Sequence, residues 1–426
     1  MTKNKKIIPE LRFPEFENEG SWTKKRLADF DDLPSGDGDW ILSKDISLNG
    51  SYKIVQLSSI GFGSFKEKVL KTISEETFAE LNGTPIRKGD LLINRMVDAN
   101  KINCCIFPYE NKYVTSVDVC WIRQNDSINN YFLMSLLSTG DNQIKLLSLS
   151  SGAGRVRISK SNLFDNFFFP LPKNKEEQQK IASCLSSLDE VIDVHTKKLE
   201  LLIDHKKGLM QNLFPQEGEK VPKLRFKEFE NDGEWKENKI EKICTKVSDG
   251  IHTTPQYDNA GEYYFINGNN LVQSKIVIDE NTKKINEIEY HKHKKELGDN
   301  TILLSINGTI GNIAFYSNEQ VILGKSACYI NIKPSLVNKE FFAYQLNTKR
   351  VIEYFNSQVT GAVIKNLSLK TIKETFIFIP KIEEQKKIGF CLSSLDELIT
   401  VQMDKIQQLK LHKKGLMQGL FPKIID

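Results

Sequence analysis

The sequence predicts a mixed α+β protein in which two similar globular α/β modules are separated by two long antiparallel coiled-coil helices, as a tandem repeat with pseudo-twofold symmetry. Three observations predict this fold. Residues 9–22 return as residues 222–235, and residues 176–215 return as residues 383–422 with 26 of 40 positions identical. Apolar residues also recur at helical spacing through both copies of the longer segment. We therefore expect one fold to occur twice.

The repeats also predict where the parts of the chain begin and end. At 426 residues, the chain is long enough for about three ordinary domains. The predicted parts are an N-terminal segment (1–22), a first module (23–172), a central helix (173–215), a linker that repeats the N-terminal segment (216–235), a second module (236–380) and a C-terminal helix (381–426).

The long helices are predicted over residues 176–214 and 383–421. Pro172 and Pro380 precede them, glutamates fill their first turns, and Pro215 and Pro422 end them. An amphipathic stripe needs a partner, so we expect the two helices to pack on each other; the alternative is that each lies on its own module. The stripe residues, which we expect to form the helix-pair and partner interface, are Ile181, Leu185, Leu188, Ile192, Leu199, Leu202, Ile388, Leu392, Leu395, Ile399, Ile406 and Leu409.

Each module is predicted to combine strands with helices. Runs rich in β-branched and aromatic residues indicate strands. They lie at 52–57, 91–94, 104–107, 117–122 and 167–169 in the first module, and at 263–266, 302–306, 313–316, 327–332 and 376–379 in the second. Helices are expected near 129–148 and 338–358.

Composition limits the class of protein. The basic N-terminus lacks the apolar run of a signal peptide, and no stretch approaches 18 apolar residues, so we expect a cytoplasmic protein with no membrane partner. The seven cysteines form no Cys-x-x-Cys pair, which argues against a zinc site. A net charge of +4 permits a polyanionic partner only if the positive charge is clustered.

Common catalytic motifs are missing from the sequence. Residues 324–326 read Gly-Lys-Ser, like the end of a phosphate-binding loop, but the required earlier glycine falls at Glu319. His291 and His293 lie in a charged run that is more typical of a solvated surface than of a metal site. We therefore predict no catalytic residue and no metal ligand.

Polar, glycine-bearing loops are the most distinctive feature of the modules. Arginine, asparagine, lysine and threonine side chains pair with base edges and phosphates, although they also populate ordinary turns. The candidate DNA-binding residues are Arg95, Arg155, Arg157 and Lys160 in the first module and His252, Thr253, Thr254, Asn307, Lys325 and Lys365 in the second.

Both helices carry Glu-Glu-Gln-x-Lys-Ile, Cys-Leu-Ser-Ser-Leu-Asp-Glu, His-Lys-Lys-Gly-Leu-Met-Gln and Leu-Phe-Pro, and Leu-Arg-Phe-x-Glu-Phe precedes each module. With these motifs the whole chain resembles the DNA specificity subunit of type I restriction-modification enzymes. Residues 249–255 and 298–311 are similar to target-recognition motifs of that family. The first module lacks the Asp-Gly-x-His segment found at residues 249–252.

The resemblance implies that each module is a target recognition domain that reads one half of a bipartite, asymmetric site in double-stranded DNA. It also implies that the helices set the spacer between the half-sites. Two modification (methyltransferase) subunits would dock on the helices and bring S-adenosylmethionine, while restriction (translocase and nuclease) subunits would use ATP and magnesium. The chain itself would be no enzyme and would hold no cofactor. Composition and pattern alone also allow a duplicated coiled-coil adaptor that binds proteins rather than DNA.

Overall fold

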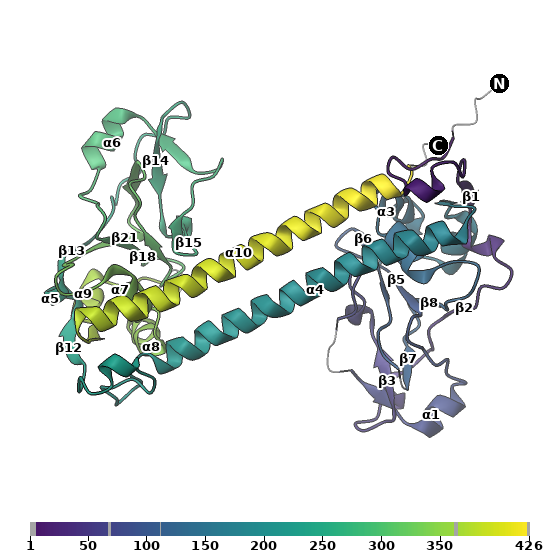
Figure 1. Ribbon diagram of the computed structural model, residues 1–426, viewed down its shortest axis with the longest axis horizontal. Coiled ribbons are helices and arrows are strands. Elements are labelled where there is room, and N and C mark those ends of the chain that lie inside the picture. Colours follow the sequence, from purple (N-terminus) through teal and green to yellow (C-terminus); the bar gives the residue numbers. More distant parts are fainter. Residues whose placement is uncertain (1–5, 67–69, 111, 362–364, 424–426) are drawn as a thin grey trace. The chain divides into compact units, whose positions relative to one another are not determined.

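The computed structural model describes residues 6–66, 70–110, 112–361 and 365–423. The chain forms two compact units (Figure 1). Unit 1 comprises Met1–Thr196 and Asp404–Asp426, and unit 2 comprises Lys197–Met403. Each unit therefore joins one module to a part of each long helix. The outermost residues of the predicted first and last segments, 1–5 and 424–426, lie outside the described residues.

The module of unit 1 is built on a six-stranded sheet with strand β5 (Leu91–Asp98) at its centre. Its strand order is β2-β8-β5-β10-β9, and β6 also pairs with β5. A second sheet has the order β4-β3-β7, and β1 pairs with β11. The bounds are β1 Thr23–Lys25, β2 Ser35–Asp37, β3 Tyr52–Val55, β4 Thr72–Ile73, β6 Lys101–Ile106, β7 Tyr113–Thr115, β8 Val119–Ile122, β9 Ser150–Ser151, β10 Arg157–Ile158 and β11 Phe169–Leu171, with helices α1 Glu75–Glu80, α2 Asn130–Leu137 and α3 Gly140–Ser148.

The module of unit 2 has a four-stranded sheet in the order β13-β21-β18-β19 and a three-stranded sheet in the order β17-β14-β20. Strand pairs β15-β16 and β12-β22 complete it. The bounds are β12 Lys236–Lys239, β13 Cys244–Asp249, β14 Tyr263–Ile266, β15 Leu271–Val272, β16 Lys275–Ile276, β17 Lys283–Ile285, β18 Thr301–Ser305, β19 Ile313–Phe315, β20 Val321–Leu323, β21 Ala327–Ile332 and β22 Phe376–Ile379, with helices α5 Ile240–Ile243, α6 Glu287–His293, α7 Lys339–Leu346, α8 Lys349–Gln358 and α9 Leu369–Glu374.

The register of the strands confirms that the two modules share one fold. In unit 1, Leu91 of β5 lies opposite Ile122 of β8; in unit 2, Ile302 of β18 lies opposite Ile330 of β21. All four side chains are fully buried. The central strands are covered on both faces, which explains why they appear in the sequence as short apolar runs without alternation.

Each helix predicted over residues 129–148 and 338–358 is in fact two helices. Thr139 separates α2 from α3, and Thr348 separates α7 from α8. Both threonines adopt an extended backbone, with ψ of 148° and 149°. Their hydroxyl groups donate to carbonyl oxygens of the preceding helix, at 2.9 Å for Thr139 and 2.8 Å for Thr348. These bonds satisfy a helix end and allow the chain to turn.

The long helices α4 (Lys175–Asn212) and α10 (Ile382–Leu420) begin and end within two residues of their predicted bounds. Near its N-terminus each helix lies on its own module, because Ile181 and Leu185 belong to the core of unit 1, and Ile388 and Leu392 to that of unit 2. The other predicted stripe residues are buried or half-buried. The alternative interpretation, in which each long helix lies on its own module, therefore holds for the first turns of both helices.

A carboxylate links the two long helices within each unit. In unit 1, Asp189 of α4 accepts hydrogen bonds from Lys413 of α10, with the Lys413 Nζ 2.6 Å from both oxygens, and from the Tyr131 hydroxyl. In unit 2, Asp396 of α10 accepts from Lys206 of α4 at 2.6 Å and from Tyr344 at 2.7 Å. Burial and the neighbouring carboxylate raise the pKa of both tyrosines above the usual range, so they remain protonated donors at neutral pH.

The repeated Leu-Arg-Phe segments dock on the long helices through buried ion pairs. The Arg12 guanidinium binds both oxygens of Glu177 in α4 at 2.8 Å. The Arg225 guanidinium binds Glu384 in α10 at 2.8 and 2.7 Å. Both glutamates are almost inaccessible to solvent, with side chains 1% and 0% exposed. The hydrogen bonds to these glutamates raise the pKa of both arginines, so both guanidinium groups keep their positive charge.

The Glu384→Ala substitution should strongly destabilise unit 2. It leaves the buried Arg225 guanidinium without its carboxylate, which typically costs about 3–5 kcal/mol of unfolding free energy. The measurement is urea unfolding of the full chain followed by circular dichroism. Glu383→Ala is the matched control, because this exposed glutamate precedes Glu384 in the same turn; it should change stability by less than about 0.5 kcal/mol. Equal stability of the two variants would contradict the structural role of the pair.

Candidate functional site

Three loops of unit 2 meet at the end of β18. The Ile306 backbone N–H donates to the Ser326 carbonyl at 3.0 Å, and the Gly308 N–H donates to the Lys365 carbonyl at 2.9 Å. The Asn307 Nδ2 donates to the Lys325 carbonyl at 3.1 Å. We call residues 306–311, 324–326, 360–361 and 365–366 the loop cluster of unit 2. Residues 362–364 of the third loop lie outside the described residues.

The end of β13 joins this cluster. The Ile251 N–H donates to the Leu323 carbonyl at 2.7 Å, which places the preceding Gly250 against that strand. A Cβ on Gly250 would lie 1.9 Å from the Leu323 oxygen, so only glycine fits. The next side chain, His252, is 70% exposed, and its Nε2 lies 2.9 Å from Asp249 Oδ2. The imidazole is thereby held at the edge of the cluster.

The structure brings together four of the six residues predicted for the second module. His252, Lys325 and Lys365 are exposed, and Asn307 is half-buried with its amide engaged. Thr253 and Thr254 follow His252 and are also exposed.

Unit 1 repeats the backbone frame of this cluster along the C-terminal half of β5. The Arg95 N–H donates to the Asp118 carbonyl at 3.0 Å, as Ile306 does to Ser326. The Val97 N–H donates to the Val156 carbonyl at 3.0 Å, as Gly308 does to Lys365. We call residues 95–100, 116–118 and 152–157 the loop cluster of unit 1. A hollow of about 620 Å³ opens between these loops and Leu57.

The residues predicted for the first module occupy different places. Arg155 is exposed and lines the hollow, while Arg157 is partly exposed with its Nη1 3.2 Å from Asp118. Lys160 is half-buried over the Phe164 ring, outside the loop cluster. Arg95 is only 6% exposed, and its Nη2 donates to the Val117 carbonyl at 3.0 Å. Its guanidinium also pairs with Asp37, so Arg95 supports the loops from beneath and does not form part of their surface.

Trp40 is a residue of the site that the sequence did not indicate. Asp37 lies opposite Cys120 in unit 1, as Asp249 lies opposite Cys328 in unit 2. The Asp39 N–H donates to the Thr115 carbonyl at 2.8 Å, in the same way as Ile251 donates to Leu323. Residues 37–40, Asp-Gly-Asp-Trp, therefore take the place of residues 249–252, Asp-Gly-Ile-His.

The first module thus has an equivalent of the Asp-Gly-x-His segment, with tryptophan in place of histidine. The first module does lack the Asp-Gly-x-His sequence itself, and strand register places residues 37–40 in the equivalent position. The sequence did contain a signal for this equivalence. The spacing between the Asp-Gly pairs at 37 and 249 is nearly the same as the spacing between the two copies of the other repeated segments. Two residues are too short a match to align without strand register.

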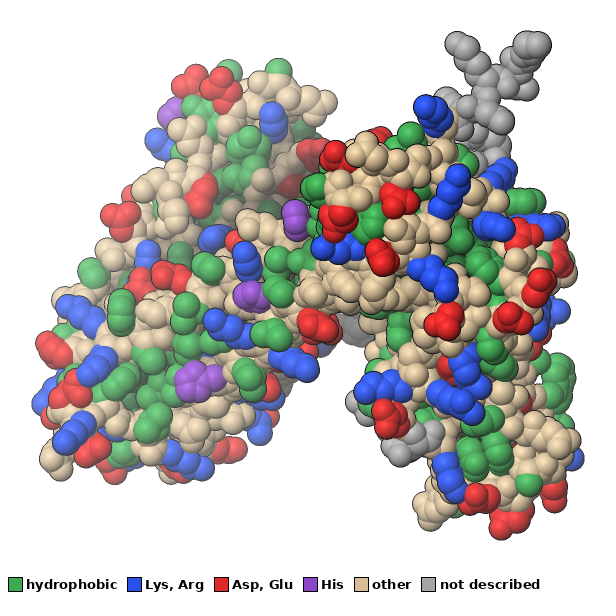
Figure 2. All heavy atoms as spheres, turned by 45° about the vertical axis from the view of Figure 1, so that its right-hand side comes forward, with side chains coloured by type: hydrophobic (Ala, Val, Ile, Leu, Met, Phe, Trp, Pro, Cys, Tyr) green, Lys and Arg blue, Asp and Glu red, His purple; other side chains and the backbone are tan. Residues whose placement is uncertain are grey.

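Charge on the surface is mixed. On the face drawn in Figure 2, lysine and arginine side chains are interspersed with aspartate and glutamate. Binding to a polyanion would thus depend on individual placed cations more than on a broad positive field.

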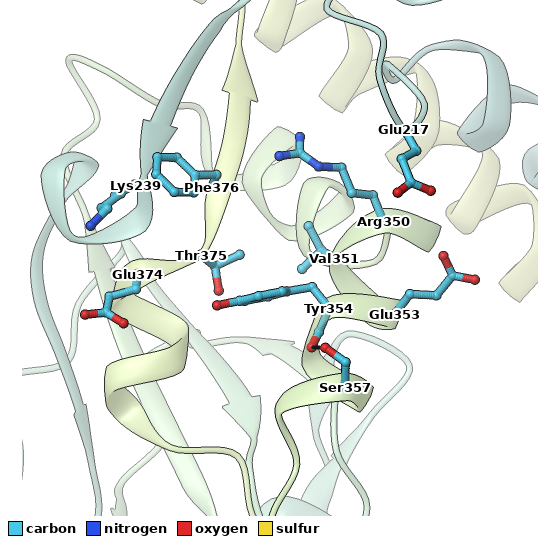
Figure 3. Close-up of a pocket in the computed structure, with 10 residues that line it drawn as sticks. All are labelled: Glu217, Lys239, Arg350, Val351, Glu353, Tyr354, Ser357, Glu374, Thr375 and Phe376. Atoms are coloured by element: carbon cyan, nitrogen blue, oxygen red, sulfur yellow. Dashed lines mark hydrogen bonds between the residues drawn. The ribbon is translucent and has the colours of Figure 1, made fainter.

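A pocket of about 690 Å³ lies elsewhere on unit 2, between α8, α9 and β22 (Figure 3). Its charged lining consists of Glu217, Glu353 and Glu374 with Lys239 and Arg350. Arg350 is already engaged, because it pairs with a carboxylate outside the lining, that of Glu237, at 2.8 Å. None of the predicted DNA-binding residues lines this pocket.

Within the described residues, no group of three or more His, Cys, Asp or Glu side chains is arranged to hold a metal ion. Over the same residues, no helix combines the length and the apolar character needed to cross a membrane.

Comparison with known proteins identifies the family. Residues 19–203 and 232–411 each match the model of the type I restriction modification DNA specificity domain. The two matches cover most of the chain and coincide with the two repeats. The chain therefore belongs to the family of type I restriction-modification DNA specificity subunits, as the motifs of the long helices indicated.

Individual relatives agree with this assignment. The type I restriction enzyme MjaVIII specificity subunit of Methanocaldococcus jannaschii is 24% identical over 432 residues, covering 98% of this chain and 95% of that protein. The MjaX protein of the same archaeon, provisionally assigned as a specificity subunit, is 27% identical over 346 residues, covering 78% of this chain and 77% of that protein.

Solved structures share the fold. The S subunit of a type I restriction-modification system from M. genitalium superimposes with a TM-score of 0.64 at 17% identity, covering 98% of this chain and all of that one. A chain from a study of complex assembly in the type I system gives a TM-score of 0.53 at 17% identity, covering 95% and 98%.

Proposed function

We propose that this chain is the non-catalytic recognition subunit of a type I restriction-modification complex and that each loop cluster reads one half of a bipartite, asymmetric site in double-stranded DNA. One observation carries the proposal: the two units share a backbone frame at the cluster but present different side chains on it. Equivalent backbone hydrogen bonds place Trp40 where unit 2 has His252, and Val156 where it has Lys365. A shared frame with different side chains suits two different half-sites.

The side chains of the clusters suit DNA in two ways. Exposed lysines such as Lys325 and Lys365 can neutralise phosphates, which gives affinity without sequence information. Arginine side chains such as Arg155 can donate two hydrogen bonds to guanine in the major groove. Arg157 would have to exchange its contact with Asp118 for one with DNA.

Replacing Lys325 and Lys365 by alanine together should weaken DNA binding and reduce its salt dependence. Each lost phosphate contact lowers the slope of log Kd against log salt by about 0.9, so the pair should lower it by about 1.8. The measurement is a salt titration of DNA binding by the assembled complex. The control is Lys220→Ala with Lys381→Ala, since these lysines are exposed and pair with Glu234 and Asp232 outside the loop cluster. An unchanged slope in the double variant would contradict the proposed contacts. If DNA binding by the wild-type complex were absent or independent of salt, the alternative of a coiled-coil adaptor that binds proteins would be favoured.

Exchanging residues 236–380 for the corresponding module of a relative should change one half-site and leave the other unchanged. The reason is that each loop cluster is formed within a single unit. The measurement is sequencing of methyladenine in DNA from cells that express the chain with its modification subunit. A change in both half-sites would contradict modular recognition.

We also propose that α4 and α10 set the spacer between the half-sites. In α4, Lys206 follows Asp189 by 17 positions, and in α10 Lys413 follows Asp396 by the same number. The two helices therefore match in length between the carboxylate contacts that link them. At about 1.5 Å per residue, this segment is roughly 25 Å long.

Deleting residues 195–201 together with 402–408 should shorten the preferred spacer by about three base pairs. Seven residues correspond to about 10.5 Å of helix, and base pairs are stacked about 3.4 Å apart. The carboxylate contacts are retained, because Asp189, Lys206, Asp396 and Lys413 all lie outside the deletions. The measurement is again the methylated motif. Deleting only 195–201 is the control and should abolish recognition, since the two helices then differ in length. An unchanged spacer in the double deletion would contradict the proposal that the helices set the spacer.

The proposal for the partners rests on exposed apolar residues at equivalent positions of the two long helices. Val194 of α4 and Val401 of α10 are equivalent in the repeat and are 65% and 66% exposed. Val191 and Leu398 form a second equivalent exposed pair. Apolar side chains that are exposed at equivalent places suit two copies of one partner. We propose that these partners are two modification subunits, which bind S-adenosylmethionine and methylate adenine, and that restriction subunits add the ATP- and magnesium-dependent steps.

A further inference from the structure

We propose that Trp40 is a specificity-determining residue that reads a thymine in the half-site of unit 1. The inference rests on the proposed function of the loop clusters and adds to it the chemistry of one contact.

The backbone holds Trp40 in a fixed place. The Asp39 N–H donates to the Thr115 carbonyl at 2.8 Å, and the Asp39 carboxylate accepts from the Thr84 N–H at 3.0 and 3.2 Å. The Ile41 N–H donates to the Asp39 carbonyl at 3.1 Å, which closes a three-residue turn with Trp40 at its centre. On the other side, a Cβ on Gly38 would lie 2.1 Å from the Ser116 carbonyl oxygen. The turn is therefore packed against strand β7 and the turn that follows it, and its position is set before any ligand binds.

The side chain of Trp40 nevertheless remains in solvent. Trp40 is 68% exposed, whereas Trp22 and Trp235 are 3% and 2% exposed. A single exposed apolar residue is common on protein surfaces and by itself indicates nothing. Trp40, however, stands at the position where unit 2 presents His252, and the adjoining Ser116 begins one loop of the unit 1 cluster. An aromatic side chain carried by a backbone that is held in this way is suited to contact a ligand.

The chemistry of indole selects among the bases. Indole offers one donor, Nε1–H, beside a large apolar surface and has no acceptor. In the major groove thymine presents an acceptor, O4, next to its C5-methyl group, which matches both features. Guanine presents two acceptors and adenine one, N7, but neither base has an apolar group beside them, and cytosine presents an amino donor that indole cannot accept. Thymine is thus the base that Trp40 fits best.

The test uses the complex of the full chain with its modification subunits and a duplex that carries its methylated motif. Deoxyuridine replaces each thymine of the unit 1 half-site in turn, which removes only the methyl group. At one position the wild-type complex should bind the deoxyuridine duplex about 3- to 5-fold more weakly, the effect expected for burial of one methyl group. The Trp40→Ala complex should not distinguish thymine from deoxyuridine there. Its preference for thymine over the other bases at that position should fall by about 10-fold or more, with the other positions unchanged.

Leu48→Ala is the matched control, because Leu48 is a 99% exposed apolar residue in the same module; it should behave as the wild type. If the Trp40→Ala complex keeps the full response to deoxyuridine, the inference is overturned while the proposed function stands. If no complex prefers the motif over unrelated DNA, the proposed function itself fails. The deoxyuridine series on the wild-type complex needs no variant, and the absence of any sensitive thymine would also overturn the inference.

Discussion

The carboxylate that joins the two long helices is the contact on which the rest of each unit depends. Asp189 in unit 1 and Asp396 in unit 2 each accept a hydrogen bond from a lysine of the other long helix. Each also accepts one from a tyrosine of its own module. One side chain therefore fixes the register of the helix pair and the placement of the module on it. Because lysine and tyrosine both donate, the oxygens of each carboxylate receive hydrogen bonds from two directions, as a partly buried polar group requires.

The cores of the modules depend on the same helices. Phe421, just beyond the end of α10, packs on Phe132 in the core of unit 1, where Trp22 is also buried. Phe214, just beyond the end of α4, packs in the same way on Phe341 and Trp235 in unit 2. Each core is thus completed by the end of the helix that began on the other module. This arrangement explains why Leu-Phe-Pro and Leu-Arg-Phe are repeated so closely, since a change in either segment would leave a cavity or an unpaired charge in a core.

Sequence patterns predicted the long helices and the central strands well, and the loop clusters poorly. The 3.6-residue period and the flanking prolines are local signals, so α4 and α10 could be placed within two residues. The break at Thr139 depends on a hydroxyl contact with the preceding helix, which the apolar period does not reveal. Whether an arginine is exposed depends on the register of the strands around it. Arg95 and Arg155 look alike in sequence, yet one is buried against Asp37 and the other lines the hollow.

Strand register also explains how two copies of one fold can acquire different specificities. The loops of each cluster are positioned by backbone hydrogen bonds, such as those from Arg95 to Asp118 and from Ile306 to Ser326, and these bonds do not depend on which side chains the loops carry. The charge and the shape of the surface can therefore change without moving the loops. Glycine is required at Gly38 and Gly250, because a Cβ there would collide with the neighbouring strand or turn. The residue two positions after each glycine, Trp40 or His252, is exposed and free to differ, so the frame stays fixed while the contact residue changes.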